Sequence, residues 1–332
     1  MKYFLVLVIV LISGLLLLGF LLPKEFVVEK ENSSFDFDIK KENKEVLLFF
    51  VGDIMLDRGV ESMVKKEGRG EFKFPFLKIS NYLSKADILF GNLESIISDK
   101  GRKIGSIYSF RAEPEAIEGL TFAGFDIVSL ANNHALDYTS EALKDCFSRL
   151  KKAGISYVGA GDNEKEAFSL KIREAKSAKI GFLAFTNLGP EVWRAGKDSP
   201  GIAWISEESI ENIKGIVKNA KEEVDVLVVS LHAGQEYEKE PNSFQVSFSK
   251  NCIDSGADLI IGHHSHVVQP VEKYKDGWIA YSLGNFIFDQ DFSEETMKGL
   301  LLQVIIEEKK IKNVNSKEIR ISNFFQPYAP NI

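Results

Sequence analysis

All five histidines of the chain lie in three short stretches, and each stretch follows an apolar run. Two carboxylates, Asp53 and Glu94, occupy the same kind of position. Imidazole nitrogens and carboxylate oxygens are ligands that proteins offer to zinc, iron and manganese, whereas calcium prefers an all-oxygen shell. The pattern therefore predicts a divalent-metal site. Its histidines are His134, His232, His263, His264 and His266.

Each of these signals also has a purely structural interpretation. Asp53 can cap a following helix, and Asn133 with His134 can form a hydrogen-bonded turn. The cluster 262–266 favours ligation, because three imidazoles in four positions are unfavourable to bury without partners. Alternation along the chain points His263 away from His264, so we expect a structural role for His263.

Short apolar runs alternate with helical patterns from Val46 onward, as in an α/β protein. Helices are expected over 139–153 and 207–221, where apolar residues recur at helical spacing. The runs 278–283 and 300–306 follow one another without a full helical pattern, and 311–321 alternates weakly, which predicts antiparallel closure of a sheet. The polar residues follow the strands, where open α/β sheets place ligand sites. The seven runs that indicate buried strands are 46–51, 88–90, 127–130, 180–185, 224–231, 259–261 and 278–283.

The N-terminus carries an uncharged run at 3–22, long enough to cross a bilayer as a helix. It meets Pro23-Lys24-Glu25 with no small-residue cleavage site and no lipobox cysteine, which favours an uncleaved anchor over a signal peptide. We expect an anchor or signal segment over 1–23, a polar linker over 24–45 and an exported main domain over 46–325. The protein would then be a single-pass protein of the cell membrane.

Composition narrows the class of protein. A chain with 45% hydrophobic and 27% charged residues can bury a full core. A net charge of −7, without a basic face interleaved with aromatic residues, argues against a nucleic-acid partner. Cys146 and Cys252 lie in predicted helices without CxxC spacing, and we expect buried free thiols rather than a disulfide.

The motifs together resemble the capsule synthesis protein CapA (poly-gamma-glutamate) family. That family is similar to the calcineurin-like metallophosphatases, which implies an α/β fold of the four-layer α/β/β/α sandwich type, with two packed sheets flanked by helices, preceded here by the predicted transmembrane helix. The motifs are Val51-Gly-Asp-Ile-Met-Leu-Asp-Arg58, Gly91-Asn-Leu-Glu94, Ala131-Asn-Asn-His134, Leu231-His-Ala-Gly-Gln-Glu-Tyr237, Gly262-His-His-Ser-His266 and Ser282-Leu-Gly-Asn-Phe286.

The resemblance implies a role for each motif residue. His134 takes the place of a proton donor, and Asp137 is expected to orient its ring. Metallophosphatases usually carry Asp-x-His where this chain has Met55, and Asp where it has Asn92, so one of two metal sites is expected to be weak or missing. The implied metal ligands are Asp53, Glu94, Asn133, His232, His264 and His266. Independently of the resemblance, side-chain chemistry makes Arg58 and Glu236 candidates for substrate binding, since arginine pairs with a carboxylate or phosphate. Asn285 is a third candidate, unless the stretch 282–286 is only a tight turn at a strand end.

These residues predict a hydrolytic site that holds one or two ions of Mn, Fe or Zn. Such an ion lowers the pKa of water from 15.7 toward about 7, and His134 would protonate the leaving group. The expected function is a membrane-anchored, outward-facing hydrolase or transferase in the biosynthesis of a cell-surface polymer of poly-gamma-glutamate type. Polymer synthase or export subunits are expected partners. Two alternatives stay open: a non-catalytic accessory subunit of such a complex, and a general metallophosphoesterase.

Overall fold

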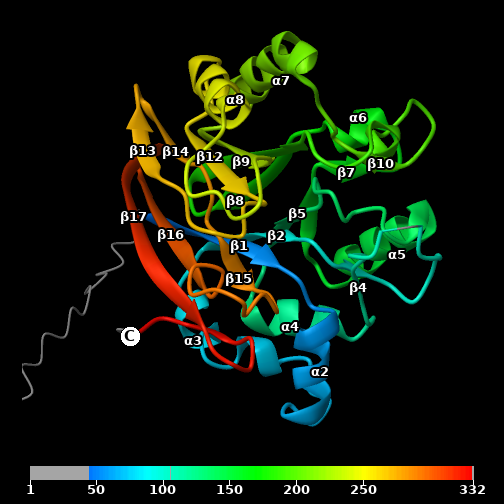
Figure 1. Cartoon of the computed structure of the whole chain (residues 1–332). Helices are drawn as coiled ribbons and strands as arrows, with labels where there is room; N and C mark the ends of the chain where they lie inside the picture. The colour runs from blue at the N-terminus through cyan, green and yellow to red at the C-terminus, as the bar shows by residue number, and fades with distance from the viewer. Residues whose placement is uncertain (1–44, 105, 331–332) are drawn as a thin grey trace, which may run out of the picture. The chain divides into compact units, whose positions relative to one another are not determined.

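Two β-sheets face each other in the computed structural model, which describes residues 45–104 and 106–330 (Figure 1). Within these residues the first sheet has eight strands and the second has six. The first sheet contains β1 (Val46–Ile54), β2 (Ile88–Leu93), β5 (Ile127–Ser129), β6 (Ser156–Val158), β15 (Asn285–Ile287), β16 (Lys298–Glu307), β17 (Lys310–Ile321) and β18 (Pro327–Tyr328). The second contains β8 (Lys171–Ala175), β9 (Ala178–Thr186), β11 (Val226–His232), β12 (Leu259–His263), β13 (Val271–Tyr274) and β14 (Gly277–Ala280).

Parallel pairs dominate the middle of both sheets. The first sheet runs in the order β18-β17-β16-β1-β2-β5-β6, with β15 paired to β1, and the second runs β13-β14-β12-β11-β9-β8. Strands β16 and β17 are antiparallel to each other, and β16 is antiparallel to β1, which confirms the predicted closure of a sheet. The expectation that 278–283 joins this closure is wrong, because β14 lies in the second sheet, where it is parallel to β12 and antiparallel to β13.

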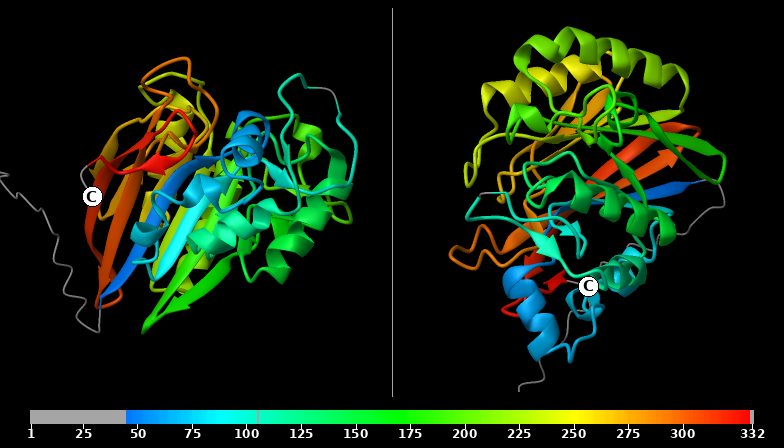
Figure 2. Two further views of the ribbon diagram at one scale, coloured as in Figure 1. Left: turned by 90° about the horizontal axis from the view of Figure 1, so that it is seen from below. Right: turned by 90° about the vertical axis from the view of Figure 1, so that its right-hand side faces the viewer.

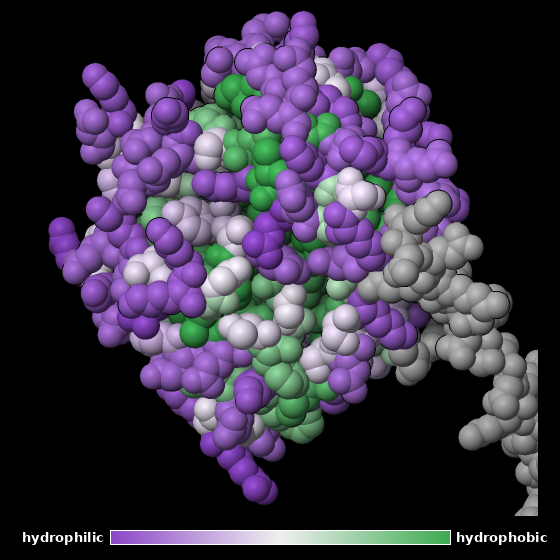
Figure 3. Space-filling model, turned by 180° about the vertical axis from the view of Figure 1, so that it is seen from behind, coloured by the Kyte–Doolittle hydropathy of each residue, from purple (hydrophilic) through white to green (hydrophobic). Residues whose placement is uncertain are grey.

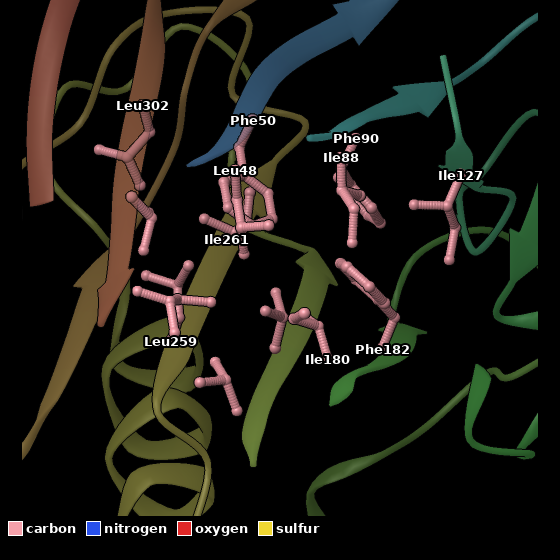
Figure 4. Packing of buried hydrophobic residues seen from close by; sticks show 14 of the residues in the cluster. Leu48, Phe50, Ile88, Phe90, Ile127, Ile180, Phe182, Leu259, Ile261 and Leu302 are labelled. Carbon is pink, nitrogen blue, oxygen red and sulfur yellow. The ribbon is translucent and has the colours of Figure 1, made fainter. Parts of the chain in front are cut away.

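The two sheets pack through one apolar core. Side chains that alternate along β1 and β2 face those of β9, β11 and β12 (Figure 4). Phe90 of β2 stacks on Phe182 of β9 with ring centroids 5.7 Å apart. Burial of a side chain of this size stabilises the fold by about 1.5–3 kcal/mol. The core therefore holds the carboxyl ends of strands from both sheets in a fixed relation.

Helices cover the outer face of each sheet, which gives a mixed α/β fold (right-hand view of Figure 2). Val217 and Phe248 of α7 and α8 pack on β11 through a second apolar cluster. Tyr82 of α3 stacks on Phe49 of β1 at 5.4 Å on the other side. The helices are α2 (Arg58–Lys66), α3 (Ser80–Leu83), α4 (Ala116–Ala123), α5 (Thr139–Lys152), α6 (Glu164–Ala167), α7 (Ile210–Glu222) and α8 (Ser243–Asp254).

Short elements complete the chain. The predicted helix 207–221 begins as a 3₁₀ turn, Glu207–Ser209, before α7. Two further 3₁₀ turns span Phe74–Phe76 and Glu191–Trp193. Seen from behind, hydrophilic residues cover much of the surface, with apolar residues exposed between them (Figure 3). The two small sheets pair β3 (Ile96–Ile97) with β4 (Arg111–Ala112) and β7 (Ala160–Gly161) with β10 (Gly201–Ile202).

The predicted membrane segment, 3–22, lies outside the described residues, as does all of the predicted linker except Glu45. The part of the chain that the structure describes contains no helix that is long and apolar enough to cross a bilayer. The boundaries of the predicted domain, 46–325, stay a prediction. Cys146 and Cys252 are buried and unpaired, on α5 and α8.

Candidate metal centre

Asp53 lies near the end of β1, at the centre of the first sheet. It is fully buried, and it pairs with Asn92 of β2 on one side and with Asn285 of β15 on the other. The Nδ2 of Asn92 donates to Oδ1 of Asp53 at 2.9 Å. The chain returns to this sheet through Gly284, whose left-handed backbone (φ 66°) brings its carbonyl to the amide of Asp53. The carboxylate is thus placed by two neighbouring strands.

Asn92 links three predicted ligands. Its Nδ2 lies 3.1 Å from Nδ1 of His232 and 3.5 Å from Oε1 of Glu94, in addition to its bond to Asp53. The side chain of Asn132 in turn donates to Oδ1 of Asn92 at 3.2 Å. Sequence reasoning missed this role for both asparagines. The available signal was the position of Asn92 inside a buried strand, two residues before Glu94.

His232 brings the second sheet to the site. It ends β11, and its Nε2 lies 2.7 Å from Oδ1 of Asn133 and 3.9 Å from Oε1 of Glu94. Thr186 of the neighbouring strand donates to the carbonyl of His232 and fixes its backbone. Ligand atoms of Asp53, Glu94 and His232 all lie within 4.8 Å of one another. The structure therefore brings together ligands predicted from three separate strands.

His264 and His266 follow β12 in left-handed backbone conformations, with φ of 93° and 56°. Such conformations are unfavourable for non-glycine residues, and they cluster at functional sites. The amide of His264 donates to Oδ2 of Asp53 at 3.0 Å, and Nδ1 of His266 lies 3.5 Å from the same oxygen. Gly262, two residues before His264, lets the backbone of Tyr281 pass close to β12, because a Cβ there would lie 1.9 Å from the carbonyl oxygen of Tyr281.

His263 is fully buried, and its Nδ1 lies 3.1 Å from Oδ1 of Asp53. The contact lacks hydrogen-bond alignment, so both ring nitrogens are without a hydrogen-bond partner within the described chain. Alternation along β12 does separate this ring from His264, but it does not remove it from the site. The structural role of His263 stays a prediction.

Burial decides the charge state of three of the imidazoles. It lowers the pKa of His264 to about 3, and it lowers the pKa of His232 and of His266 as well. Burial, together with the charge of Asp53, raises the pKa of Glu94 well above its usual value. Burial alone would raise the pKa of Asp53, but contact with His263 and the other imidazoles outweighs it and holds that pKa below its usual range.

The residues of this site fit a divalent cation. Oε2 of Glu94 and Nδ1 of His264 are buried and have no hydrogen-bond partner in the described part of the chain. Neutral imidazoles present lone pairs, and buried polar atoms without partners are unfavourable unless something else binds them. A donor set of nitrogen and oxygen without cysteine suits Mn, Fe or Zn. The identity of the ion stays a prediction.

A histidine–aspartate pair lies beside these ligands. Nδ1 of His134 is 2.8 Å from Oδ2 of Asp137, which also accepts from the amide of Phe110 at 2.9 Å. The ring of Phe110 lies 4.0 Å from the imidazole, centroid to centroid. On the other side of the ring, Nε2 of His134 lies 3.1 Å from Nδ2 of Asn133, the residue whose Oδ1 contacts His232. Asp137 thus fixes the orientation of the imidazole ring, and the role of His134 as a proton donor stays a prediction.

Two adjoining cavities, of about 350 and about 520 Å³, reach this pair, and both have Tyr108, Asn133 and His134 in their walls. Arg58 and Glu236 line the larger cavity, as expected for substrate-binding residues. The guanidinium of Arg58 forms an ion pair with Asp289 and lies 4.7 Å from the ring centroid of Phe110.

Asn285 is placed differently from Arg58 and Glu236. It is fully buried and lines neither of these cavities. Its Oδ1 lies 2.9 Å from Nδ1 of His266, and its Nδ2 donates to the carbonyl of Thr296 and to Gln290. The structure therefore brings Asn285 behind an imidazole, where it orients the ring, rather than to the predicted substrate.

Comparison with known proteins identifies the family of the chain. Residues 47–290 match the model of the family described as bacterial capsule synthesis protein PGA_cap. The chain belongs to this family. It is 34% identical over 266 residues to the capsule biosynthesis protein CapA of Bacillus anthracis, which covers 79% of this chain and 64% of that protein. It is 32% identical to the PGA biosynthesis protein CapA of Bacillus subtilis (strain 168), covering 76% of this chain and 66% of the relative.

Membership of the PGA_cap family confirms the predicted CapA-like relationship. The chain spans just under two thirds of the length of these two relatives. Among solved structures, a novel phosphatase from Mycoplasma pneumoniae has a similar fold, with a TM-score of 0.50 and 15% identity, covering 86% of this chain and 95% of the phosphatase. At that level of identity the likeness concerns the fold alone.

Proposed function

We propose that this PGA_cap protein is a metal-dependent hydrolase that acts outside the cell membrane on a cell-surface polymer of poly-gamma-glutamate type. The observation that carries the proposal is the meeting of Asp53, Glu94 and His232 beside His134 in the wall of a cavity. The polymer comes from the printed names of the two Bacillus relatives, and the location from the apolar run 3–22.

Asp53, Glu94 and His232 would hold the cation, with Asn133 beside His232 as a further oxygen donor. A bound divalent cation supplies Lewis-acid catalysis. His134 is within reach of both cavities and is oriented by Asp137, so it donates a proton to the group that leaves. In the described walls of the two cavities Arg58 is the only lysine or arginine, and it would bind one carboxylate of the substrate.

The test combines metal content with turnover. The full-length protein, purified in detergent and loaded with Mn²⁺, is expected to cleave poly-gamma-glutamate, and the substitution His134→Ala to reduce kcat by about 10²–10⁴-fold with unchanged metal content. His232→Ala should instead lose the metal. The matched control Asn251→Ala, on the exposed side of α8, should change neither quantity.

Other outcomes separate the alternatives. Metal-dependent cleavage of an aryl phosphate without cleavage of the polymer would make the protein a general metallophosphoesterase. A metal-loaded protein that turns over neither substrate, and whose His134→Ala variant still supports capsule formation in cells, would make it an accessory subunit of a polymer synthase. Either result would refute the proposed activity.

A further inference from the structure

The two cavities beside His134 differ in the charge of their walls. The wall of the larger cavity contains Arg58, whose guanidinium forms an ion pair with Asp289. The smaller cavity has no lysine or arginine among its described wall residues, and its only carboxylate is that of Asp137. That carboxylate already accepts from the amide of Phe110 and contacts Nδ1 of His134. A negatively charged group therefore finds a positive partner in the larger cavity but no lysine or arginine in the described wall of the smaller one.

Much of the wall of the smaller cavity is apolar. Four of its residues come from one segment, and they are Leu188, Gly189, Pro190 and Trp193. Gly189 has a left-handed backbone (φ 77°), and a Cβ there would lie 3.4 Å from Cα of Asn133 and 3.4 Å from Cε3 of Trp193. The ring of Trp193 therefore lies close to Asn133, whose Oδ1 contacts the predicted ligand His232. An apolar wall thus adjoins the candidate metal centre.

Hydrogen bonds fix this apolar segment to the centre. The hydroxyl of Thr186 donates to the carbonyl of His232 at 2.7 Å and accepts from the amide of Leu188 at 3.1 Å. Nε1 of Trp204 donates to the carbonyl of Gly189 at 3.2 Å. The volume of the cavity, about 350 Å³, lies within the range of about 300–1,000 Å³ that is typical of small-molecule sites. The smaller cavity is therefore a preformed apolar site whose wall is tied to the backbone of a predicted metal ligand.

We propose that the smaller cavity binds an uncharged apolar group that is joined by an amide bond to a glutamyl unit, while the carboxylate of that unit pairs with Arg58 in the larger cavity. The inference rests on the proposed function, since it places the cleaved bond at His134, which belongs to both walls. An internal bond of poly-gamma-glutamate has a free carboxylate on each side, and burying a carboxylate without a cation is unfavourable. We therefore expect faster cleavage where the acidic chain is joined to an uncharged group than within the chain.

The reaction is an ordinary hydrolysis of that amide. The C–N bond breaks, and the hydroxyl of water joins the carbonyl carbon. The amine in the smaller cavity leaves with the proton that His134 donates, and the remaining proton of water returns to His134. The side of the bond that carries the apolar group is thus the side of the leaving amine.

Two matched amides test this site, γ-glutamylbenzylamide and γ-glutamylglutamate, which share the glutamyl unit and differ in the charge of the other group. Calorimetry on full-length protein, purified in detergent and loaded with Mn²⁺, gives the Kd of each amide, and product release gives kcat/KM. We expect the benzylamide to have a Kd lower by about tenfold or more, and a higher kcat/KM. Trp193→Ala should remove this preference by weakening the binding of the benzylamide alone. The matched control is Val192→Ala, because Val192 is 85% exposed and lies in neither wall, and it should bind both amides as the wild type does.

An added charge tests the same site in the opposite direction. Leu188 is half-buried in the wall of the smaller cavity, and Leu188→Lys supplies the cation that this wall lacks. The variant should bind γ-glutamylglutamate more tightly than the wild type does, and the benzylamide more weakly. A general loss of structure would not improve the binding of either amide. Leu188→Lys therefore decides the inference if Trp193→Ala lowers the thermal stability of the protein.

Three results would overturn the inference: equal Kd values of the two amides in the wild type, an unchanged preference in Trp193→Ala, or no tighter binding of γ-glutamylglutamate by Leu188→Lys. Cleavage of poly-gamma-glutamate alongside any of them would leave the proposed hydrolase intact. Preferential binding of the benzylamide without cleavage of any amide would instead support the apolar site and refute the hydrolase.

Discussion

Replacing Glu94 with glutamine should have opposite effects on stability in the absence and in the presence of metal. The side chain of Glu94 is fully buried beside Asp53, and its Oε2 has no partner in the described structure. Burial raises the pKa of Glu94, so at pH 7 the metal-free protein must protonate on folding a carboxyl group that is ionised in the unfolded chain. Glutamine has nearly the same shape and needs no such protonation. We therefore expect metal-free Glu94→Gln to be more stable than the wild type by about 1–3 kcal/mol at pH 7.

Metal should reverse this order. At a Mn²⁺ concentration about 100-fold above Kd, binding stabilises the wild type by about 2.7 kcal/mol. The variant has lost a charged ligand, so it should gain far less at the same concentration. Each kcal/mol corresponds to a shift in Tm of roughly 2–4 °C for a large domain. Glu94→Gln should thus have the higher Tm in a thermal scan in chelator, and the wild type should have the higher Tm in a scan in Mn²⁺.

Thermal unfolding followed by circular dichroism measures both states in one series. Glu118→Gln is the control, because Glu118 is exposed on α4, and its Tm should equal that of the wild type in both conditions. The reasoning would be refuted if Glu94→Gln were destabilised equally in chelator and in Mn²⁺. That result would mean that Glu94 stabilises the fold through its own contacts and not through a cation.

Two further predictions concern the fold. Asp145→Asn should reduce the free energy of unfolding by about 1–3 kcal/mol at pH 7, because the carboxylate accepts from Nε of Arg149 at 2.7 Å. Burial alone would raise the pKa of Asp145, but this bond outweighs it and lowers that pKa below its usual value of 3.8. The stabilisation by the Asp145 carboxylate is therefore present above pH 3.8 and is lost as the pH falls through the lowered pKa. At a pH below that pKa, urea unfolding should give the same free energy of unfolding for Asp145→Asn and the wild type. Phe182→Ala removes the ring that stacks on Phe90 between the sheets and should cost about 3–5 kcal/mol in urea unfolding, whereas Phe292→Ala, 64% exposed, should change stability by about 0.5 kcal/mol or less.

Strand positions and the gathering of most site residues were predictable, because they depend on local patterns. A short apolar run followed by a polar residue indicates a strand end, and carboxyl ends of parallel strands meet at one edge of a sheet. Asp53 and Glu94 came together for this reason, whereas His232 reaches them from the second sheet because the two sheets pack face to face. The helix over 139–153 was also predicted nearly to its bounds, since α5 spans Thr139–Lys152.

The rest depends on contacts between distant residues. An apolar run shows that a strand is buried, but not which sheet it joins, so the pairing of β14 with β12 could not be derived from 278–283. Asparagine is common in turns and caps, so nothing in its type marked Asn92 as the link between three ligands. The placing of Asn285 behind His266 follows from its pairing with Asp53 across β15, a register that local sequence does not contain.

The division of the donors between the two sheets also has a consequence for how the protein matures. Asp53 is encoded near the start of the folded region, and His266 comes only after most of it has been made. The nascent chain must therefore be made from Asp53 through His266 before it contains both residues. It has no complete cation site until the two sheets close on each other. The ion would then be taken up in the cellular compartment in which folding is completed. Since availability, more than intrinsic affinity, selects between transition metals in cells, the supply in that compartment would determine which metal the mature protein carries.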